Sequence, residues 1–438
     1  MEPVKIGLLG LGTVGGGTVT VLTRNASEIA RRAGRGIEIA RAAARDYRPE
    51  TIQGLERIGH IGSDAFAVVD DPEIQVVVEL IGGYSPAREL VLRAIANGKH
   101  VVTANKALIA RHGNEIFAAA REQGVMVGFE AAVAGGVPII KALREGLAAN
   151  HIDWIAGIIN GTANFILTEM RDKGRDFAEV LAEAQALGYA EADPTFDIEG
   201  IDAAHKLTIL GSLAFGIPLQ LERCFTEGIS GIAAVDIVYA AEMGYRIKHL
   251  GIARRSPNGI ELRVHPTLIP ERRLLANVDG VMNAVLVKGD AVGPTLFYGA
   301  GAGALPTASA VIADLVDVVR TLTTDPSNRV PHLAFQADEL VDIPVLRMDE
   351  VRTSYYLRMS ALDQPGVMAR IASILGEEGI SIEAIKQKQP GEGETHVSLV
   401  MLTHSVIEGR MNEAIARIEA LDAVAGPVTR IRMENLSG

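Results

Sequence analysis

The first third of the chain alternates short apolar runs with longer amphipathic stretches. The apolar runs cover residues 4–9, 37–44, 76–81, 100–103 and 125–130. Runs of this length are typical of strands buried on both faces of a parallel sheet. The stretches between them have helical length, as over 13–33 and over 85–97. Strands and helices in alternation predict a doubly wound α/β sheet with right-handed crossovers.

A different succession of elements is predicted near the C-terminus. The strands are expected over 354–360, 380–388, 395–403 and 427–433, and the helices over 365–378 and 406–421. The turns between them read D-Q-P-G, Q-P-G-E-G-E and T-H-S. This β-α-β-β-α-β succession is the ferredoxin-like order. The chain is therefore expected to end in a separate α+β domain.

The first predicted strand leads into a glycine-rich turn that reads G-L-G-T-V-G. A strand before it and a helix after it are the context in which G-x-G-x-x-G binds a dinucleotide. Gly10 permits the tight turn, Gly12 lets the backbone approach a pyrophosphate, and Gly15 lets the helix lie close to the strand. The N–H groups of Thr13 and Val14 at the helix start favour phosphate oxygens. The alternative is a tight turn without a ligand.

The residues after the second predicted strand leave the choice of nucleotide open. Arg45 and Asp46 follow that strand, where the adenosine ribose is usually bound. An acidic residue there favours NAD, and an arginine can hold the 2′-phosphate of NADP. The prediction is therefore NADP or NAD, with Arg45 as a cofactor-binding residue. A surface Arg–Asp pair is the alternative.

Residues 188–206 read G-Y-A-E-A-D-P-T-F-D-I-E-G-I-D-A-A-H-K and carry carboxylates ahead of one lysine. On a helix, Asp202 and Lys206 are i,i+4 neighbours on one face. The helix that follows is apolar nearly all round, which predicts that this pair is buried or half-buried. A buried lysine has a movable pKa and can act as a general acid or base. An ordinary i,i+4 ion pair is the alternative.

Composition narrows the class of protein. The chain has 438 residues, of which 48% are hydrophobic and only 4% aromatic, so two or three domains with aliphatic cores are expected. A net charge of −12 argues against nucleic acid or an anionic membrane as partner. There is no apolar run of 18 residues and no signal peptide. The single cysteine, Cys224, suits a reducing cytoplasm.

The 188–206 segment closely resembles the signature of homoserine dehydrogenases. The run V-T-A-N-K that ends at Lys106 also resembles this family, as do N-G-T-A-N-F from Asn160 and the glycines at 299–303. The resemblance spans residue 1 to about residue 322. It implies a Rossmann-type nucleotide domain, an α+β domain for substrate binding and dimerisation, and the C-terminal ferredoxin-like domain. The implied boundaries are 1–130 with a returning helix at 303–322, 131–302, a linker at 323–350, and 351–438.

The resemblance implies an NAD(P)-dependent interconversion of L-homoserine and L-aspartate 4-semialdehyde, in threonine and methionine biosynthesis. Lys206 then donates a proton to the aldehyde oxygen and removes it in the reverse direction, while Asp202 holds or tunes this lysine. Glu191 pairs with the substrate ammonium. The other implied contacts are Asp197, Lys106, Gly161 and Thr162 for substrate, and Lys106 and Gly303 for cofactor. Thr162 is equally a candidate N-cap for a helix at 164–172.

The glycine-rich turn after the fifth predicted strand is implied by the resemblance to bind a sodium ion, mainly through main-chain oxygens. The carried-over positions are Glu130, Val133, Gly135 and Val137. A hard cation prefers such oxygen ligands. A purely structural turn is the alternative.

The C-terminal run L-D-Q-P-G-V-M-A-R looks like an ACT domain, a module that binds amino acids between paired copies. Residues 351–438 are therefore expected to sense an end product, threonine foremost, in a homodimer or homotetramer. A ferredoxin-like domain that only dimerises is the alternative.

The residues argue against two other classes of function. An aspartate-semialdehyde dehydrogenase needs a cysteine nucleophile, but Cys224 lies in L-E-R-C-F-T-E-G, away from any site motif. An amino-acid sensor with an inactive dehydrogenase half would not need the intact 188–206 segment.

Overall fold

The computed structural model describes residues 2–388 and 395–437. The chain divides into two compact units. The first comprises residues 1–161, 202–222 and 281–343, and the second comprises residues 162–201, 223–280 and 344–438. Each unit is thus assembled from segments that are distant in sequence.

The first unit contains the predicted parallel sheet, with strand order β3-β2-β1-β4-β5-β6. The strands are β1 (Val4–Leu9), β2 (Ile37–Ala43), β3 (His60–Gly62), β4 (Val76–Glu79), β5 (His100–Thr103) and β6 (Val127–Gly128). All neighbouring pairs are parallel. The side chains of β1 and β4 are almost wholly buried, as expected for strands covered on both faces.

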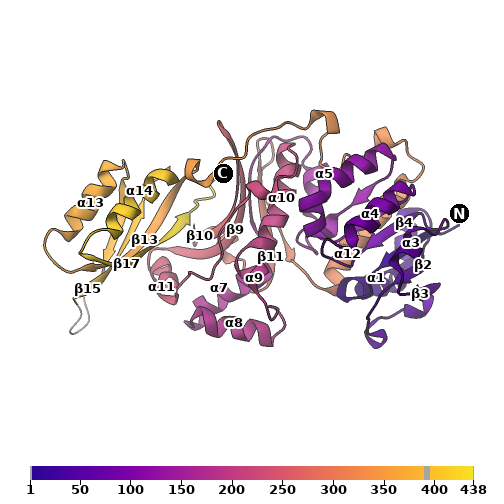
Figure 1. The fold of residues 1–438 in the computed structure, drawn as a ribbon, viewed down its shortest axis with the longest axis horizontal. Helices are drawn as coiled ribbons and strands as arrows, with labels where there is room; N and C mark the ends of the chain where they lie inside the picture. Colours follow the sequence, from indigo (N-terminus) through magenta and orange to yellow (C-terminus); the bar gives the residue numbers. More distant parts are fainter. Residues whose placement is uncertain (1, 389–394, 438) are drawn as a thin grey trace. The chain divides into compact units, whose positions relative to one another are not determined.

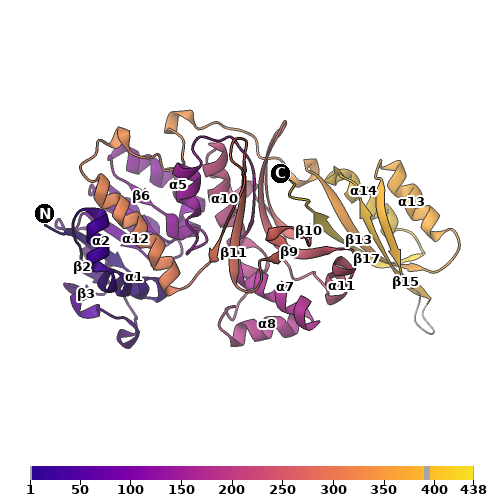
Figure 2. The ribbon, with the colours of Figure 1, turned by 180° about the vertical axis from the view of Figure 1, so that it is seen from behind.

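Helices cover both faces of this sheet. They are α1 (Thr13–Arg24), α2 (Ala26–Ala33), α3 (Ala65–Val69), α4 (Ala87–Ala96), α5 (Lys106–Glu122) and α12 (Ala304–Thr321). Figure 1 shows α4 and α5 in front of the sheet, and Figure 2, from behind, shows α12 along the other face. The returning helix α12 packs against α1, so a distant segment completes the helical layer on this face of the sheet.

In the first unit two local expectations were wrong, and two elements were not predicted. The single helix expected over 13–33 is two helices, because Asn25 between them leaves the helical conformation at φ −107° and ψ 18°. The elements β3 and α3 were not predicted, since periodicity needs longer segments. The strand expected over 125–130 is reduced to β6, after which Glu130–Ala132 form a 3₁₀ turn.

The remainder of the first unit is an antiparallel group of strands and a buried helix. The elements are β7 (Ile152–Ile158), β11 (Met282–Gly289), β12 (Gly293–Ala300), α6 (Ile139–Lys141) and α10 (Ile201–Phe215). Strand β11 pairs with both β7 and β12. Every residue of α10 after Ile201 is buried, which confirms the prediction of a buried helix from its all-round apolar pattern.

The second unit combines helices with a long mixed sheet. Its helices are α7 (Gly161–Lys173), α8 (Phe177–Ala186), α9 (Thr195–Ile198), α11 (Ala234–Glu242), α13 (Val367–Glu377) and α14 (Glu408–Glu419). Its strands are β8 (Phe225–Thr226), β9 (Tyr245–Ser256), β10 (Gly259–Pro270), β13 (Arg352–Leu362), β14 (Ile382–Gln387), β15 (His396–Thr403), β16 (Val406–Ile407) and β17 (Val424–Met433). The longer strands run in the order β9-β10-β17-β13-β15-β14.

The C-terminal part has the predicted β-α-β-β-α-β succession with one short strand added. The helix expected over 406–421 is α14 and begins at Glu408, because Val406 and Ile407 form β16, which pairs with β13. Its expected turn Q-P-G-E-G-E, at 389–394, lies outside the described residues. Its last strand, β17, pairs in parallel with β10. The domain is therefore joined to the rest of the second unit by a continuous sheet as well as by the chain.

Charged side chains reinforce this junction. Arg432 is fully buried, and it donates to Glu408 at 2.7 Å and to Glu227 at 2.8 Å. The buried Asp236 on α11 accepts from the Tyr356 hydroxyl at 2.9 Å and pairs with Arg358. Buried ion pairs of this kind fix one arrangement, because losing either partner leaves a buried charge.

Over residues 2–388 and 395–437, none of the helices combines the length and the apolar character needed to span a bilayer.

Candidate active site

The glycine turn between β1 and α1 has the geometry that a pyrophosphate site requires. Gly10 has φ +99°, a left-handed value that favours glycine. A Cβ at Gly15 would lie 2.0 Å from the carbonyl oxygen of Gly10, whereas a Cβ at Gly12 would meet no atom within 4 Å. Gly15 is thus required for close packing of the helix on the strand. The space beside Gly12 remains open for a ligand, at the N-terminus of α1.

The other two predicted cofactor contacts lie in the same unit. Arg45 is exposed in the bend after β2, next to the exposed Asp46, so the choice between NAD and NADP stays open. Gly303 is the N-cap of α12, with φ +122°. Its neighbour Ala304 contacts α1 so closely that a Cβ on Gly17 would lie 2.4 Å from the Ala304 carbonyl oxygen. Gly17 was not predicted as important, because its role depends on a helix that returns from far along the chain.

A buried carboxylate organises the carboxyl ends of β4 and β5. Glu79 accepts backbone N–H groups from Ile81 at 2.8 Å and Gly82 at 3.1 Å, and the Thr103 hydroxyl at 2.7 Å. The Thr103 oxygen in turn accepts the N–H of Asn105 at 3.0 Å. Ligands bind at this edge of doubly wound sheets. Sequence reasoning missed Glu79, although a carboxylate closing the apolar run V-V-V-E was the available signal.

Asp202 on α10 is the centre of the candidate catalytic group. Its carboxylate binds Lys206 at 2.6 Å and Lys106, the first residue of α5, at 3.0 Å. The Asn160 amide donates to it at 2.9 Å, and the Lys206 ammonium also donates to the Ile159 carbonyl oxygen at 2.8 Å. The structure therefore brings the predicted residues Lys106, Asp202 and Lys206 together, and adds Asn160. The Asn160 contact was not predicted, because only folding brings β7 beside α10.

The electrostatics of this group follow from burial and opposite charges. The side chains of Asp202 and Lys206 are only 4% and 11% exposed, and that of Lys106 is 35% exposed. Burial raises the pKa of the Asp202 carboxyl, but the charges of Lys206 and Lys106 and the hydrogen bonds from Lys206 and Asn160 outweigh it and hold that pKa well below its usual range. A permanent carboxylate thus faces two ammonium groups, and one of them is buried.

Of the other predicted substrate contacts, Gly161 ends a segment of the first unit, and Glu191, Asp197 and Thr162 belong to the second unit. Glu191 is exposed and Asp197, on α9, is half-buried. Gln185 holds the segment before α9 by donating to the Glu191 carbonyl oxygen at 3.0 Å. Thr162 donates its hydroxyl to the Tyr189 carbonyl oxygen at 2.7 Å. Thr162 lies inside the first turn of α7, so the alternative that it is an N-cap is wrong.

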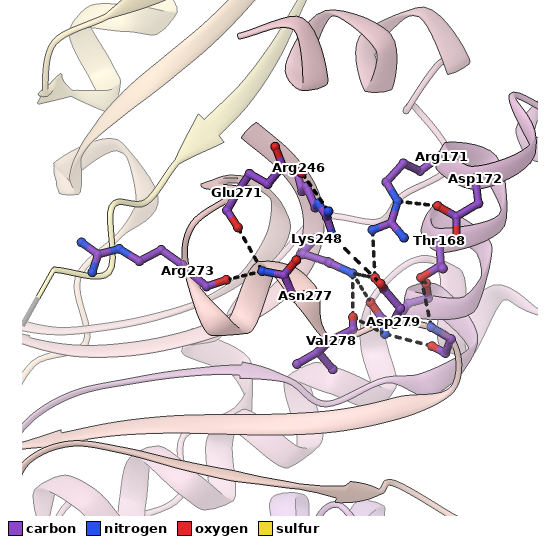
Figure 3. A network of polar contacts seen from close by, with 12 residues as sticks. Thr168, Arg171, Asp172, Arg246, Lys248, Glu271, Arg273, Asn277, Val278 and Asp279 are labelled. Atoms are coloured by element: carbon purple, nitrogen blue, oxygen red, sulfur yellow. Dashed lines mark hydrogen bonds and ion pairs between the residues drawn. The ribbon is translucent and has the colours of Figure 1, made fainter. Parts of the chain in front are cut away.

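A buried lysine anchors the first turns of α7, the helix that begins at Gly161. Lys248 on β9 donates to the Val278 carbonyl oxygen at 2.6 Å, to Asp279 at 2.9 Å and to the Asn164 side-chain oxygen at 3.3 Å. Asn164 donates to the carbonyl oxygens of Val278 at 3.0 Å and Gly280 at 2.9 Å. Figure 3 shows this network, in which the Asp279 carboxylate pairs with both Lys248 and Arg171.

Burial of the Lys248 ammonium disfavours its charged form. Burial lowers the pKa of Lys248 to about 8, against the hydrogen bond and charge of Asp279. The network gives a role to the second asparagine of N-G-T-A-N-F: Asn164 fixes the helix on which Thr162 lies.

The turn predicted to bind sodium is tightly held. The Glu130 carboxylate is buried and accepts the N–H groups of Ile140 at 3.0 Å and Lys141 at 2.7 Å. Burial and the nearby Asp314 raise the pKa of Glu130 to about 7. Ala134 has φ +51°, a left-handed value that is rare for a residue other than glycine. In the part of the chain that the structure describes, three or more His, Cys, Asp or Glu side chains nowhere gather as metal ligands.

Models of known families match the chain over nearly its whole length. Residues 138–316 match the model of homoserine dehydrogenase. Residues 10–130 match the model of the homoserine dehydrogenase NAD binding domain, and residues 355–423 match that of the ACT domain. The three matches follow the order of domains expected from the sequence.

The chain is similar to individual homoserine dehydrogenases over their full length. The chain is 67% identical over 437 residues to the homoserine dehydrogenase of Pseudomonas aeruginosa and 60% identical over 436 residues to that of Neisseria gonorrhoeae, with 100% of each chain covered. The crystal structure of a homoserine dehydrogenase from Thiobacillus denitrificans is 68% identical and superposes with a TM-score of 0.95, covering 100% of this chain and 99% of that one. A hyperthermophilic archaeal homoserine dehydrogenase in complex with NADPH is 28% identical, with a TM-score of 0.61, over 74% of this chain and 98% of that one.

Proposed function

The chain belongs to the homoserine dehydrogenase family of NAD(P)-dependent oxidoreductases, and on that premise we propose that Lys206 is its acid/base group. The reaction interconverts L-homoserine and L-aspartate 4-semialdehyde. The observation that carries this proposal is the Lys206 ammonium held between Asp202 at 2.6 Å and the Ile159 carbonyl oxygen at 2.8 Å. Both neighbours accept hydrogen bonds, so they stabilise the proton-bearing form.

The proton transfer follows from this arrangement. In semialdehyde reduction, Lys206 donates a proton from Nζ to the aldehyde oxygen, which becomes the hydroxyl of homoserine. In homoserine oxidation, the amine accepts that proton from the hydroxyl. Asp202 keeps the lysine oriented, and Lys106 shares the same carboxylate. A second ammonium beside the site opposes accumulation of positive charge on Lys206 and so eases proton release.

The cofactor is proposed to bind at the glycine turn, where its nicotinamide supplies or accepts the hydride. The residues that would hold it are Gly10, Gly12, Thr13, Val14, Gly15, Arg45, Lys106 and Gly303. The open space beside Gly12 and the tight packing at Gly15 support this assignment. The archaeal relative bound to NADPH supports use of NADP, and NAD remains the alternative for this chain.

Substrate binding is proposed on the resemblance of the motifs. Glu191 is assigned to the substrate ammonium, and Asp197, Gly161 and Thr162 complete the set with Lys106. The anchor of α7 through Asn164 supports a fixed position for Thr162. The domain division at residues 130, 302 and 350, and the cytoplasmic location, belong to the same proposal.

The experiment that tests the assignment is Lys206→Ala. We expect kcat to fall by roughly 10²-fold or more, as for loss of a general acid, with cofactor affinity nearly unchanged. Steady-state kinetics in both directions and calorimetric titration of NADP and NAD measure the two effects. Lys5→Ala, at a half-buried lysine paired with Glu73, is the matched control. Near-normal kcat in Lys206→Ala would contradict the assignment.

A sodium ion at the 133–137 turn is a further part of the proposal. The left-handed Ala134 supports it, since such strain persists where the surroundings, or a ligand, hold it in place. Glu130, Val133, Gly135 and Val137 would supply oxygens. A rise in melting temperature in sodium chloride, relative to choline chloride at equal ionic strength, is the expected result. Equal melting temperatures in the two salts would contradict the proposal of a sodium site.

Regulation by threonine at the ACT domain, in a homodimer or homotetramer, is also proposed. Its D-Q-P-G turn is held by a bond from Gln387 to Asp363 at 3.1 Å. Removing the domain is a poor test, because β17 pairs with β10 and its removal would expose buried charges. Gln364→Ala and Asp363→Ala should instead abolish threonine inhibition and leave kcat intact. The exposed Glu413→Ala is the control, and undiminished inhibition in both turn variants would place threonine elsewhere.

A further inference from the structure

A cavity of about 650 Å³ lies in the first unit, apart from the groups described above. Its walls come from the C-terminal half of α5, the approach to β6, and the connector segment 326–340. Neither the glycine turn nor the Lys206 group contributes to them. A volume in this range suits a small organic molecule.

The charge of the cavity wall is opposite to that of the chain. Arg121, Arg144, Arg329 and His332 line it, and its described lining contains no aspartate or glutamate. The whole chain carries a net charge of −12. A concentration of guanidinium groups in so acidic a protein is a local feature that favours an anion.

Arg144 is the most unusual member of this group. It is only 8% exposed, and in the described structure no carboxylate lies within 4.0 Å of its guanidinium nitrogens. Its one hydrogen bond is a long one, from Nη2 to the Val330 carbonyl oxygen at 3.4 Å, and Nε has none among the residues described. The guanidinium also lies over the Phe129 ring, 5.9 Å from its centroid. Burying a charge that lacks a carboxylate in direct contact is costly. Burial accordingly lowers the pKa of Arg144.

Arg329, the arginine of the connector that lines the cavity, is also incompletely bonded. Arg329 donates to the carbonyl oxygens of Gly124 at 2.7 Å and Thr324 at 3.0 Å. Its Nε has no hydrogen-bond partner within the described ranges. Two guanidinium groups that line the cavity, those of Arg144 and Arg329, thus each have an Nε donor that makes no hydrogen bond among the described residues.

The remaining wall is apolar and aromatic. The His332 ring stacks on Phe117 with ring centroids 5.0 Å apart, and Phe335 and Leu340 add apolar surface. His332 Nε2 accepts the N–H of Val127 at 3.1 Å, so this imidazole is neutral and the arginines alone supply positive charge. The wall therefore pairs cationic donors with a flat apolar surface.

We infer that this cavity binds a small organic anion, an apolar or aromatic body that carries one carboxylate or sulfonate. The anion pairs with Arg144 and Arg121, and the body packs against Phe117 and the connector. Because segment 326–340 forms one wall, an occupied cavity holds this connector against α5. The site is separate from that of the dehydrogenase reaction, so its occupancy is measured without catalysis.

The test uses two fluorescent probes of similar shape, with the full-length enzyme in excess NADP to fill nucleotide sites. 8-Anilinonaphthalene-1-sulfonate is the anion, and N-phenyl-1-naphthylamine is its neutral counterpart. We expect one saturable site that prefers the anion by about tenfold or more, the effect of one charge-assisted hydrogen bond. Arg121→Ala and Arg144→Met should each remove most of this preference.

Hydrogen exchange shows which backbone segments the bound probe protects. The anion should slow backbone exchange in residues 326–340. Arg121 is exposed, so Arg121→Ala keeps the test valid if Arg144→Met does not fold. The control is Arg31→Ala, on α2, whose side chain is 78% exposed. Equal affinity for both probes, unchanged anion binding in Arg121→Ala, or protection confined to other segments would overturn the inference.

Discussion

The buried Asp202 carboxylate pairs with two ammonium groups, so replacing it should affect both stability and catalysis. Asp202→Asn keeps the shape of the side chain and leaves Lys206 and Lys106 without a counter-charge. Breaking a buried pair in this way costs about 3–5 kcal/mol. We expect a large loss of stability, together with a fall in kcat because Lys206 loses its orientation. Urea unfolding and steady-state kinetics measure the two effects.

The pH dependence of this loss is part of the prediction. The folded pKa of Asp202 lies below the unfolded value of about 3.9. Its contribution is therefore complete above that value and is lost as the pH falls through the folded pKa. The gap in stability between the native chain and Asp202→Asn should be widest near neutral pH and narrow below pH ~4. A gap that does not change with pH would contradict the ion-pair account.

Gly12 and Gly15 belong to one motif, but we expect substitution of Gly12 to affect cofactor binding and substitution of Gly15 to affect stability. A side chain at Gly12 meets open space in the protein, so Gly12→Val should fold normally and lose cofactor binding. A side chain at Gly15 would overlap the Gly10 carbonyl oxygen, so Gly15→Val should destabilise the fold itself. Thermal melting and calorimetric titration with NADP separate the two outcomes. Cofactor binding retained by Gly12→Val would mean that the turn is only structural.

At the scale of elements, two neutral histidines hold the edge strand β6. The N–H of Met126 donates to His100 Nδ1 at 2.9 Å, and that of Val127 donates to His332 Nε2 at 3.1 Å. Burial, with arginines nearby, lowers the pKa of His100 to about 4 and that of His332 to about 3. Each ring can accept these bonds only while it is unprotonated.

These contacts predict acid sensitivity of the first unit. The unfolded pKa of histidine is about 6.5, so the stabilisation is complete above that pH and is lost as the pH falls below it. At pH 4, His100 alone should account for roughly 3 kcal/mol. His100→Gln and His332→Gln retain an acceptor that does not titrate, so their stability should fall less between pH 7 and pH 4. Parallel stability curves for the variants and the native chain would count against this explanation.

At the scale of the whole chain, the ACT domain is built into its unit. Asp236 is buried and holds both Tyr356 and Arg358 of β13. Asp236→Asn should therefore destabilise the second unit by about 3 kcal/mol, and it should weaken threonine inhibition if the domain signals through this contact. Urea unfolding and inhibition curves are the measurements. Asp349→Asn, at an exposed Arg347 pair, is the control, and matching curves for the two variants would contradict the prediction.

The sequence by itself determined the parallel sheet, the β-α-β-β-α-β end and the buried Asp202–Lys206 pair. Each of these depends on neighbours that are close in the chain: an apolar run, a glycine turn, or an i,i+4 spacing. The same local information placed Lys106 at the end of a strand, where ligands bind. It could not show that Lys106 and Lys206 share one carboxylate.

Only the tertiary structure decided the remaining features, because each joins residues far apart in sequence. Asn160 reaches Asp202 across 42 positions, and Lys248 reaches Asn164 across 84. Arg144 is buried where the connector packs near it, as its hydrogen bond to Val330 shows. The local pattern of residues carries no signal for such a contact. Long-range packing sets which polar groups are buried together, and thereby which lysine is held for chemistry and which arginine is buried with an unsatisfied Nε.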